Sequence, residues 1–270
     1  MTKIRILKNF LQPHKIPKKI FQKLKYIYKF KTYQKELFKK KQEIFFEELG
    51  LDRKKGVENL NLTKEKFEIL PNGMSSEHEV LFSSISLKKS LEIKNILEIG
   101  TYDGNNAFLL SKLFPNSNID TIDLGREDEN FRNYYNRETK INEFIEIRNK
   151  RISSSGNINF VEMNSVNLLN HKKSYDLIWI DGAHGYPVVC IDIINAIKLI
   201  RDGGLILCDD VFKNLKNSDE MYQSIATYET LSLLKSQKLI DLSLVFKRLS
   251  SKYNCLDEER KFIAICKKIN

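Results

Sequence analysis

The sequence predicts an α/β fold, in which a doubly wound sheet of seven strands carries one antiparallel strand. From about residue 74 onward, short apolar runs alternate with helical patterns, which is typical of strands joined by crossover helices. Only a short polar stretch, residues 250–260, separates the last two runs, so we expect those two strands to pair antiparallel. A chain of 270 residues can bury one core of this kind and still carry an appendage.

Seven runs of apolar and β-branched residues, each bounded by turn-forming residues, are the expected strands. They are Asn95–Ile99, Asn118–Ile122, Asn159–Met163, Tyr175–Ile180, Leu205–Cys208, Leu242–Lys247 and Phe262–Cys266. The main helices expected between them are Asn105–Leu113, Pro187–Ile200 and Glu220–Ser236. Strand alternation places Trp179 inside the sheet layer, where core packing is its expected role.

The N-terminal part of the chain is strongly basic, and we expect residues 1–73 to form a mostly helical extension of an α/β domain spanning residues 74–270. The net charge of the chain is +10, and residues 1–70 hold 19 Lys and Arg against 8 Asp and Glu. Ile20, Leu24 and Ile27 recur at helical spacing among lysines and predict an amphipathic helix with a basic face. Such a helix can contact an anionic surface, or it can pack on the domain or on a second subunit of a homodimer. Packing is the favoured interpretation.

Cysteine usage and hydropathy indicate a cytoplasmic protein. The four cysteines form no C-x-x-C pair and no zinc-ligand spacing, which favours free thiols in a reducing compartment. No apolar stretch approaches the ~18–20 residues of a membrane-spanning helix, and the basic N-terminus lacks the apolar core of a secretory signal.

The turn after the first expected strand contains the most informative residues of the chain. Gly100 and Gly104 bracket this turn, and an acid, Glu98, stands two residues before the first glycine. The spacing differs from the G-x-G-x-x-G of a dinucleotide site, and a carboxylate suits a cationic ligand better than a pyrophosphate. The turn therefore predicts a site for S-adenosylmethionine, with contacts from Glu98, Gly100, Thr101, Tyr102, Gly104 and Asn105.

Polar residues also follow the next three strands. Asp123 closes the second and can accept the two ribose hydroxyls, Asn164 and Ser165 follow the third and can bond an adenine edge, and Asp181 ends the fourth. Each residue alone is more often a cap or turn residue. Together they mark the carboxyl ends of neighbouring strands, where open α/β sheets bind ligands.

Three acids meet where the fourth and fifth strands end. Asp209 and Asp210 follow the fifth strand, and with Asp181 they would repel one another unless a positive group sits among them. A Mg²⁺ ion, or a similar divalent cation, prefers such oxygen ligands, so we expect these three residues to bind a metal. The alternative is that Asp210 caps the next turn and Asp209 is solvated.

His184 is the expected catalytic base. It follows Asp181 by three residues, in the loop that leaves the fourth strand. A neutral imidazole can take the proton of an acceptor hydroxyl as a methyl group arrives.

These residues resemble the class I S-adenosylmethionine-dependent methyltransferases, over about residues 75–268. The turn Glu98–Gly104 is similar to that of the metal-dependent O-methyltransferases of the catechol and caffeoyl-coenzyme A type, and Asp181, Asp209 and Asp210 match their metal ligands with Asp in place of Asn. His184 stands where that group often has Lys. In this respect the chain is similar to the macrolide-sugar O-methyltransferases, whose base is a His. The resemblance implies a Rossmann-like fold and metal-assisted O-methylation of a small molecule, sugar or glycan, in polysaccharide or natural-product biosynthesis.

Two other functions remain open from the sequence. One is a nucleic-acid methyltransferase whose basic N-terminal segment grips phosphates, although no Asn-Pro-Pro-Tyr-like motif is present. The other is a non-catalytic or redox protein on a Rossmann-like sheet, against which the glycine spacing and the three acids argue. The sequence does not identify the methyl acceptor.

Overall fold

The computed structural model describes residues 16–69, 76–133, 140–215, 224–250 and 260–269, and it confirms the predicted α/β sheet. Seven strands have the order β3-β2-β1-β4-β5-β7-β6. Their bounds are β1 Asn95–Ile99, β2 Asn118–Asp123, β3 Ile158–Glu162, β4 Tyr175–Ile180, β5 Ile200–Val211, β6 Ile240–Phe246 and β7 Phe262–Lys268.

One strand of the sheet runs against the others. β7 pairs antiparallel with both β5 and β6, whereas β1 pairs parallel with β2 and with β4. The predicted antiparallel pairing of the last two strands is therefore confirmed. β5 begins earlier than the sequence predicts, because an irregularity in its register lets Ile200 pair with Tyr175 ahead of the Gly203–Gly204 pair.

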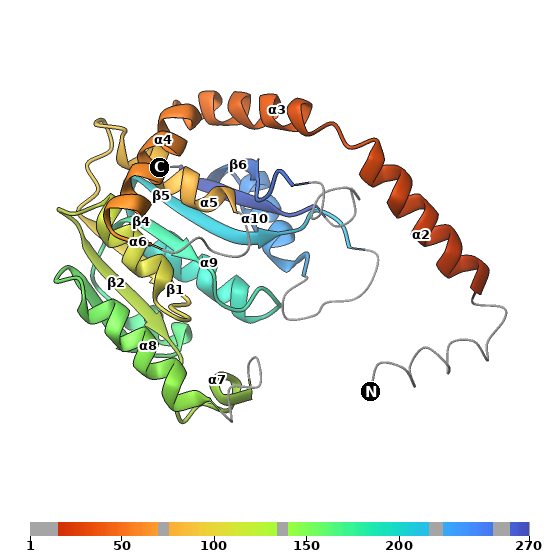
Figure 1. Cartoon of the computed structure of the whole chain (residues 1–270). Coiled ribbons are helices and arrows are strands. Elements are labelled where there is room, and N and C mark those ends of the chain that lie inside the picture. Colours follow the sequence, from red (N-terminus) through yellow and green to blue (C-terminus); the bar gives the residue numbers. More distant parts are fainter. Residues whose placement is uncertain (1–15, 70–75, 134–139, 216–223, 251–259, 270) are drawn as a thin grey trace.

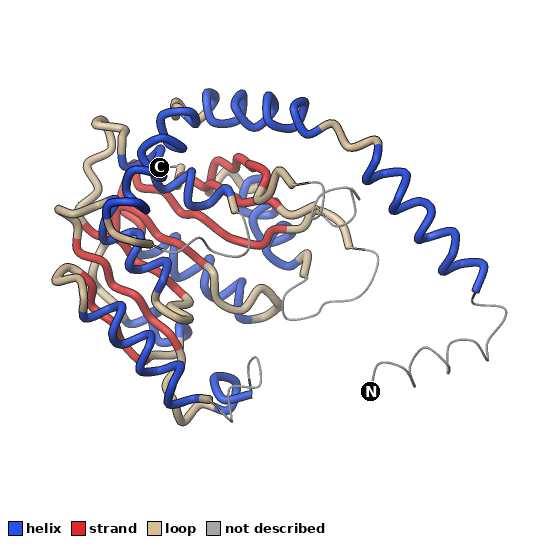
Figure 2. The backbone as a smooth tube through the Cα atoms, in the orientation of Figure 1, coloured by secondary structure: helices blue, strands red, loops and turns tan. Residues whose placement is uncertain are grey.

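Helices cover both faces of the sheet (Figure 2). Their bounds are α2 Ile16–Lys31, α3 Lys35–Glu48, α4 Arg53–Lys66, α5 Glu77–Ser86, α6 Asn105–Leu113, α7 Glu129–Asn133, α8 Ile141–Ser153, η3 Ser165–Asn170, α9 Val188–Leu199 and α10 Ala226–Ser236. Side chains of α4, α5 and α6 belong to one core layer, and those of α9 and α10 belong to the layer on the opposite face. The predicted start of the last helix, Glu220, lies outside the described residues.

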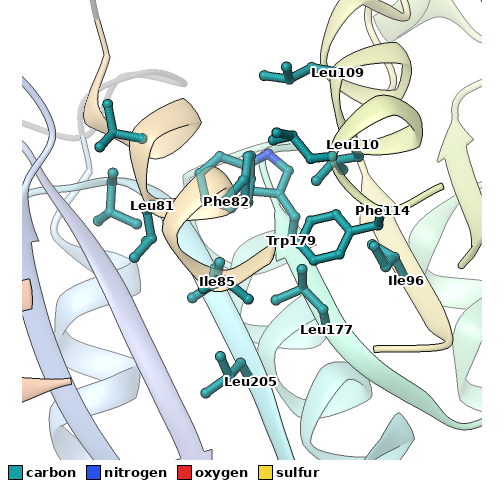
Figure 3. Packing of buried hydrophobic residues seen from close by; sticks show 14 of the residues in the cluster. Leu81, Phe82, Ile85, Ile96, Leu109, Leu110, Phe114, Leu177, Trp179 and Leu205 are labelled. Carbon is teal, nitrogen blue, oxygen red and sulfur yellow. The ribbon is translucent and has the colours of Figure 1, made fainter. Parts of the chain in front are cut away.

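Trp179 lies at the centre of the first layer, as predicted from strand alternation. Its side chain is fully buried, and its ring meets that of Phe82 edge-on at 5.0 Å between centroids. Figure 3 shows Trp179 on β4 among side chains of α5 and α6, including Leu110. An aromatic pair of this geometry contributes about 0.5–1.5 kcal/mol beyond the burial of its area.

The helices α3 and α4 pack on the α/β core. Phe46 of α3 is fully buried, and Leu60 of α4 belongs to the same apolar layer as Trp179. The buried amide of Gln42 accepts from the backbone N–H of Phe246 at 2.9 Å and donates to its carbonyl at 2.9 Å. The N-terminal region therefore covers the end of edge strand β6, while the predicted domain boundary at residue 73 lies outside the described residues.

The helix α2 has a different environment, because it projects away from the sheet (Figure 1). Phe21 and Leu24 expose 70% and 60% of their surface, and the helix carries no acid in its first turn and Lys29 and Lys31 in its last. Within the described residues, no helix combines the length and the apolar content needed to cross a bilayer.

Truncating Phe46 tests whether α3 is part of the folding unit. We expect Phe46→Ala to lower the free energy of unfolding by about 3–5 kcal/mol, because it leaves a cavity in a closely packed core. The matched variant Phe21→Ala should change this free energy by less than about 0.5 kcal/mol, because Phe21 is exposed. Urea unfolding measures both values, and equal effects would show that α3 is not part of the core.

Candidate active site

The turn after β1 and the end of β4 touch, so the structure brings Gly100 and Asp181 together as predicted for one ligand edge. A Cβ atom on Gly100 would lie 2.3 Å from the carbonyl oxygen of Asp181, and Gly100 has φ +103°. The backbone N–H of Asp181 donates to the carbonyl of Ile99 at 2.9 Å. Only glycine fits this crossing, because any side chain would collide with backbone in a conformation that L residues rarely adopt.

The rest of the turn is held by short hydrogen bonds from β2. The hydroxyls of Thr101 and Thr121 lie 2.6 Å apart, and the backbone N–H of Tyr102 donates to Asp123 Oδ2 at 2.7 Å. Tyr102 has φ +50°, an uncommon conformation for a residue with a side chain. The residue is 45% exposed, and its ring meets that of Phe144 edge-on at 5.3 Å between centroids.

Gly104 and Asn105 begin α6. Gly104 is the N-cap and is left-handed, with φ +76°. The backbone N–H of Asn105 donates to Asp103 Oδ1 at 3.0 Å, and Arg151 of α8 pairs with Asp103 Oδ2 at 2.5 Å. The turn is therefore fixed from both sides before any ligand binds.

Glu98 differs from its predicted setting, since its side chain is fully buried beneath the turn. Its carboxylate accepts from Asn106 Nδ2 at 2.7 Å and from the Thr121 hydroxyl. Burial raises the pKa of Glu98 to about 7, although these two hydrogen bonds act in the opposite direction. Glu98 thus ties α6 and β2 to the turn, and direct contact with a cofactor stays a prediction.

Asp123, Asn164 and Ser165 lie at the ends of β2 and β3. Asp123 also accepts from the N–H of Leu124 at 2.8 Å, and its contact with ribose stays a prediction. The Asn164 side chain accepts from the N–H of Val166 at 3.0 Å and so caps η3. The Ser165 carbonyl accepts from the side chain of Asn195. Contact of Asn164 and Ser165 with adenine stays a prediction.

His184 lies beside Asp181, with His184 Nε2 and Asp181 Oδ1 at 3.6 Å, which is longer than a hydrogen bond. Burial lowers the pKa of His184, and the charges of Asp210 and Asp209 only partly offset this effect. Burial and the charge of Asp209 raise the pKa of Asp181 well above its usual range. The imidazole is therefore neutral near pH 7 and able to accept a proton.

Two lysines neutralise the acids at the end of β5. Lys247 Nζ lies 2.5 Å from Asp209 Oδ2 and also contacts Asp210 Oδ1, and Lys261 Nζ contacts Asp210 Oδ2. Burial on its own would raise the pKa of Asp209 and of Asp210, but the charge of Lys247 and its hydrogen bonds, with further positive charges nearby, together outweigh burial and lower both pKa values. Asp210 is also left-handed, with φ +50°, and strain of this kind clusters at functional sites.

This arrangement does not fit the predicted magnesium site. The ammonium of Lys247 bridges the Asp209 and Asp210 carboxylates, and both oxygens of Asp210 already pair with lysines. A divalent ion bound to the same oxygens would meet a positive charge at close range. In the described ranges, no group of three or more His, Cys, Asp and Glu side chains is arranged to hold a metal ion. The sequence predicted a metal ion among these acids, and the positive group that the structure places between Asp209 and Asp210 is the Lys247 ammonium.

Sequence reasoning missed Lys247 and Lys261. Lys247 follows the apolar strand β6 and Lys261 precedes β7, so both reach the edge where β5 ends. A lysine that closes a buried strand was the available signal. His78 of α5 is buried, packs on Trp179 at 5.4 Å between ring centroids, and its Nδ1 lies 2.6 Å from the Ser76 hydroxyl.

Comparisons with known proteins agree with this geometry. The family model described as "Methyltransferase domain" matches residues 97–211, which run from β1 to the end of β5 and include the turn, His184 and both acids. Residues 97–211 are therefore a methyltransferase domain. Malonyl-[acyl-carrier protein] O-methyltransferase 2 of Ilyobacter polytropus is 25% identical over 234 residues, which cover 79% of this methyltransferase and 80% of that protein.

Solved structures share the fold of this methyltransferase. The O-methyltransferase TomG from Streptomyces achromogenes, solved in complex with S-adenosylmethionine, has a TM-score of 0.52 at 16% identity, over 84% of this chain and 96% of that one. The cofactor-bound Rv0187 from MTB has a TM-score of 0.53 at 17% identity, over 79% and 89% of the two chains.

The raised pKa of Glu98 makes the stability of the methyltransferase depend on pH. Since the folded state holds this proton up to about pH 7 and the unfolded state releases it near 4.5, stability falls as pH rises through that window. The isosteric variant Glu98→Gln does not titrate. We therefore expect its free energy of unfolding to rise by on the order of 3 kcal/mol relative to that of wild type between about pH 5 and about pH 8. Urea unfolding at both pH values measures the change.

The control position for this comparison is Glu146, an exposed residue of α8. Glu146→Gln should track wild type at both pH values. If the free energies of unfolding of Glu98→Gln and wild type differed by the same amount at both pH values, Glu98 would be ionised in the folded protein throughout the range.

Proposed function

We propose that this methyltransferase is an O-methyltransferase that transfers the methyl group of S-adenosylmethionine to a hydroxyl of a small molecule, sugar or glycan, with His184 as general base. The observation that carries the proposal is the meeting of the β1 turn, Asp181 and His184 at one strand edge. The carboxyl ends of the strands of an open α/β sheet are where ligands bind.

The cofactor contacts are part of the proposal. The Gly100–Gly104 turn would hold the methionine part of the cofactor, because the turn is already fixed by β2 and α8. Asp123 would accept the ribose hydroxyls. Such preorganisation avoids ordering the site during binding.

The chemistry asks little of the protein, because the sulfonium methyl is already activated. The acceptor oxygen forms a bond to the methyl carbon as the carbon–sulfur bond breaks and its electron pair returns to sulfur. The acceptor proton passes to the imidazole of His184, which later releases it to solvent. The protein aligns the two groups, and alignment alone contributes several kcal/mol to such displacements.

A buried neutral histidine favours a hydroxyl over a carboxylate as acceptor. The relative from Ilyobacter polytropus is named for malonyl-[acyl-carrier protein], which supplies a carboxylate. A carboxylate is ionised near pH 7 and needs no base. A carboxylate on an acyl carrier is therefore the second candidate acceptor for this chain.

Replacing His184 tests its role as base. We expect His184→Ala to lower kcat by about 10²–10⁴-fold while the affinity for S-adenosylmethionine, measured by calorimetry, stays unchanged. Because burial lowers the pKa of His184, wild-type kcat should be flat near neutral pH and fall only below the ordinary value of 6.5, as the imidazole gains its proton.

The control for this variant is His171→Gln, because His171 contacts Tyr175 at the opposite end of β4. The assay follows S-adenosylhomocysteine release with phenols, catechols, sugars and a malonylated acyl carrier. Methylation of the carboxylate alone, with full activity in His184→Ala, would overturn the hydroxyl acceptor and select the second candidate.

The exposed, lysine-rich helix α2 supports contact with an anionic surface, and we take lipid as the surface. Burying Phe21 and Leu24 in the headgroup boundary would remove from water apolar surface that is now exposed, while Lys29 and Lys31 contact the anionic lipids. We expect the double variant Phe21→Ser/Leu24→Ser to weaken binding to phosphatidylglycerol vesicles by about tenfold or more.

Vesicle flotation measures this binding, with phosphatidylcholine vesicles as the uncharged comparison. Leu62→Ser, at an exposed apolar position of α4, is the control and should bind as wild type does. Salt-sensitive RNA binding without vesicle binding would instead favour the nucleic-acid methyltransferase.

A further inference from the structure

Four charged side chains form a closed cluster at the edge where the proposed acceptor would lie. Asp209 and Asp210 are 2% and 9% exposed, and Lys247 is 6% exposed. Lys247 Nζ pairs with one oxygen of each acid, and Lys261 Nζ pairs with the second oxygen of Asp210. Two carboxylates and two ammonium groups balance, so the acids reach neutrality with protein groups alone.

The position of Lys247 is fixed by its backbone. Its N–H donates to the carbonyl of Lys261 at 3.0 Å, and its carbonyl accepts from the N–H of Glu77 at 2.7 Å. The preceding residue, Phe246, is held at both backbone groups by Gln42. A lysine with this support differs from a solvated surface lysine, because its backbone is anchored by α3, by α5 and by the residue before β7.

Asp181 borders the cluster. Its carboxyl forms a side-chain hydrogen bond with Asp209, and burial together with the charge of Asp209 raises the pKa of Asp181 well above its usual range. Because His184 Nε2 lies 3.6 Å from Asp181 Oδ1, the cluster adjoins the proposed base. An acceptor hydroxyl that faces His184 would then lie close to the Lys247 ammonium.

We propose that Lys247 is a built-in cation that takes the place of a divalent metal, so that methyl transfer by this chain needs no metal ion. This inference rests on the proposed O-methyltransferase function. As the acceptor hydroxyl loses its proton to His184, negative charge grows on its oxygen. The ammonium of Lys247, fixed in a site with little water, stabilises that charge without having to move. Asp209 and Asp210 hold the ammonium in place and take no part in the bond changes of the reaction.

Metal binding gives a test that does not depend on knowing the acceptor. Mn²⁺, which favours carboxylate oxygens, is titrated into the full chain and its binding is followed by the loss of its electron paramagnetic resonance signal. Wild type should bind no Mn²⁺ at the cluster. Lys247→Met removes the ammonium at similar length, and this variant should bind Mn²⁺ about tenfold or more tighter than wild type, because a unit charge at this range is worth more than one tenfold step in affinity.

Two variants serve as controls. Lys247→Arg keeps the charge and should gain no Mn²⁺ binding, and Lys261→Met keeps Lys247 and should gain little. Adding Asp209→Asn to Lys247→Met should abolish the gain, which places the new site at the cluster. Thermal melting shows whether each variant is folded.

Two results would overturn the inference. Tight Mn²⁺ binding by wild type that Asp209→Asn removes would show that the acids hold a metal despite Lys247, and this arm decides even if Lys247→Met fails to fold. A folded Lys247→Met that gains no Mn²⁺ binding would show that the ammonium does not occupy a cation position. S-adenosylmethionine binding by wild type, measured separately by calorimetry, shows whether the proposed function itself has failed.

Discussion

The architecture of the site depends on the close crossing of two backbones at Gly100. The turn after β1 passes over the end of β4 with 2.3 Å between a notional Cβ on Gly100 and the Asp181 carbonyl oxygen. His184 lies three residues beyond Asp181, so this crossing bears on the distance between the β1 turn and the proposed base.

Charge compensation determines what the other half of the site can be. Buried acids need a positive partner, and protein interiors supply it by ion pairs or by metals. Lys247 and Lys261 come from the ends of β6 and β7, and the reversed β7 brings both to the edge where β5 ends. The antiparallel strand, which is a topological detail of the sheet, thereby places the lysines beside Asp209 and Asp210.

The sequence predicted the strands and the meeting of Gly100 with Asp181, but it did not predict which side chains partner the buried charges. β1 and β4 have the predicted bounds because each is a mainly apolar run between turn residues. The charge on Lys247 resembled that of a solvated lysine, since nothing in the local pattern shows that β6 ends beside Asp209. Phe46 was not predicted as core, because the surrounding lysines give α3 the composition of a surface helix. Glu98 could be assigned to the turn, but its fully buried side chain depends on Asn106 and Thr121, which only the fold brings together.

The amide of Gln42 has a consequence for assembly. Sheet edges offer unpaired backbone groups that can template the addition of another chain, and natural proteins block them. At Phe246 both backbone groups of β6 are already taken by one side chain. A second copy of the protein could not extend the sheet at that end of β6 without first displacing α3. The helix α3 thus blocks edge-to-edge aggregation at this end of β6.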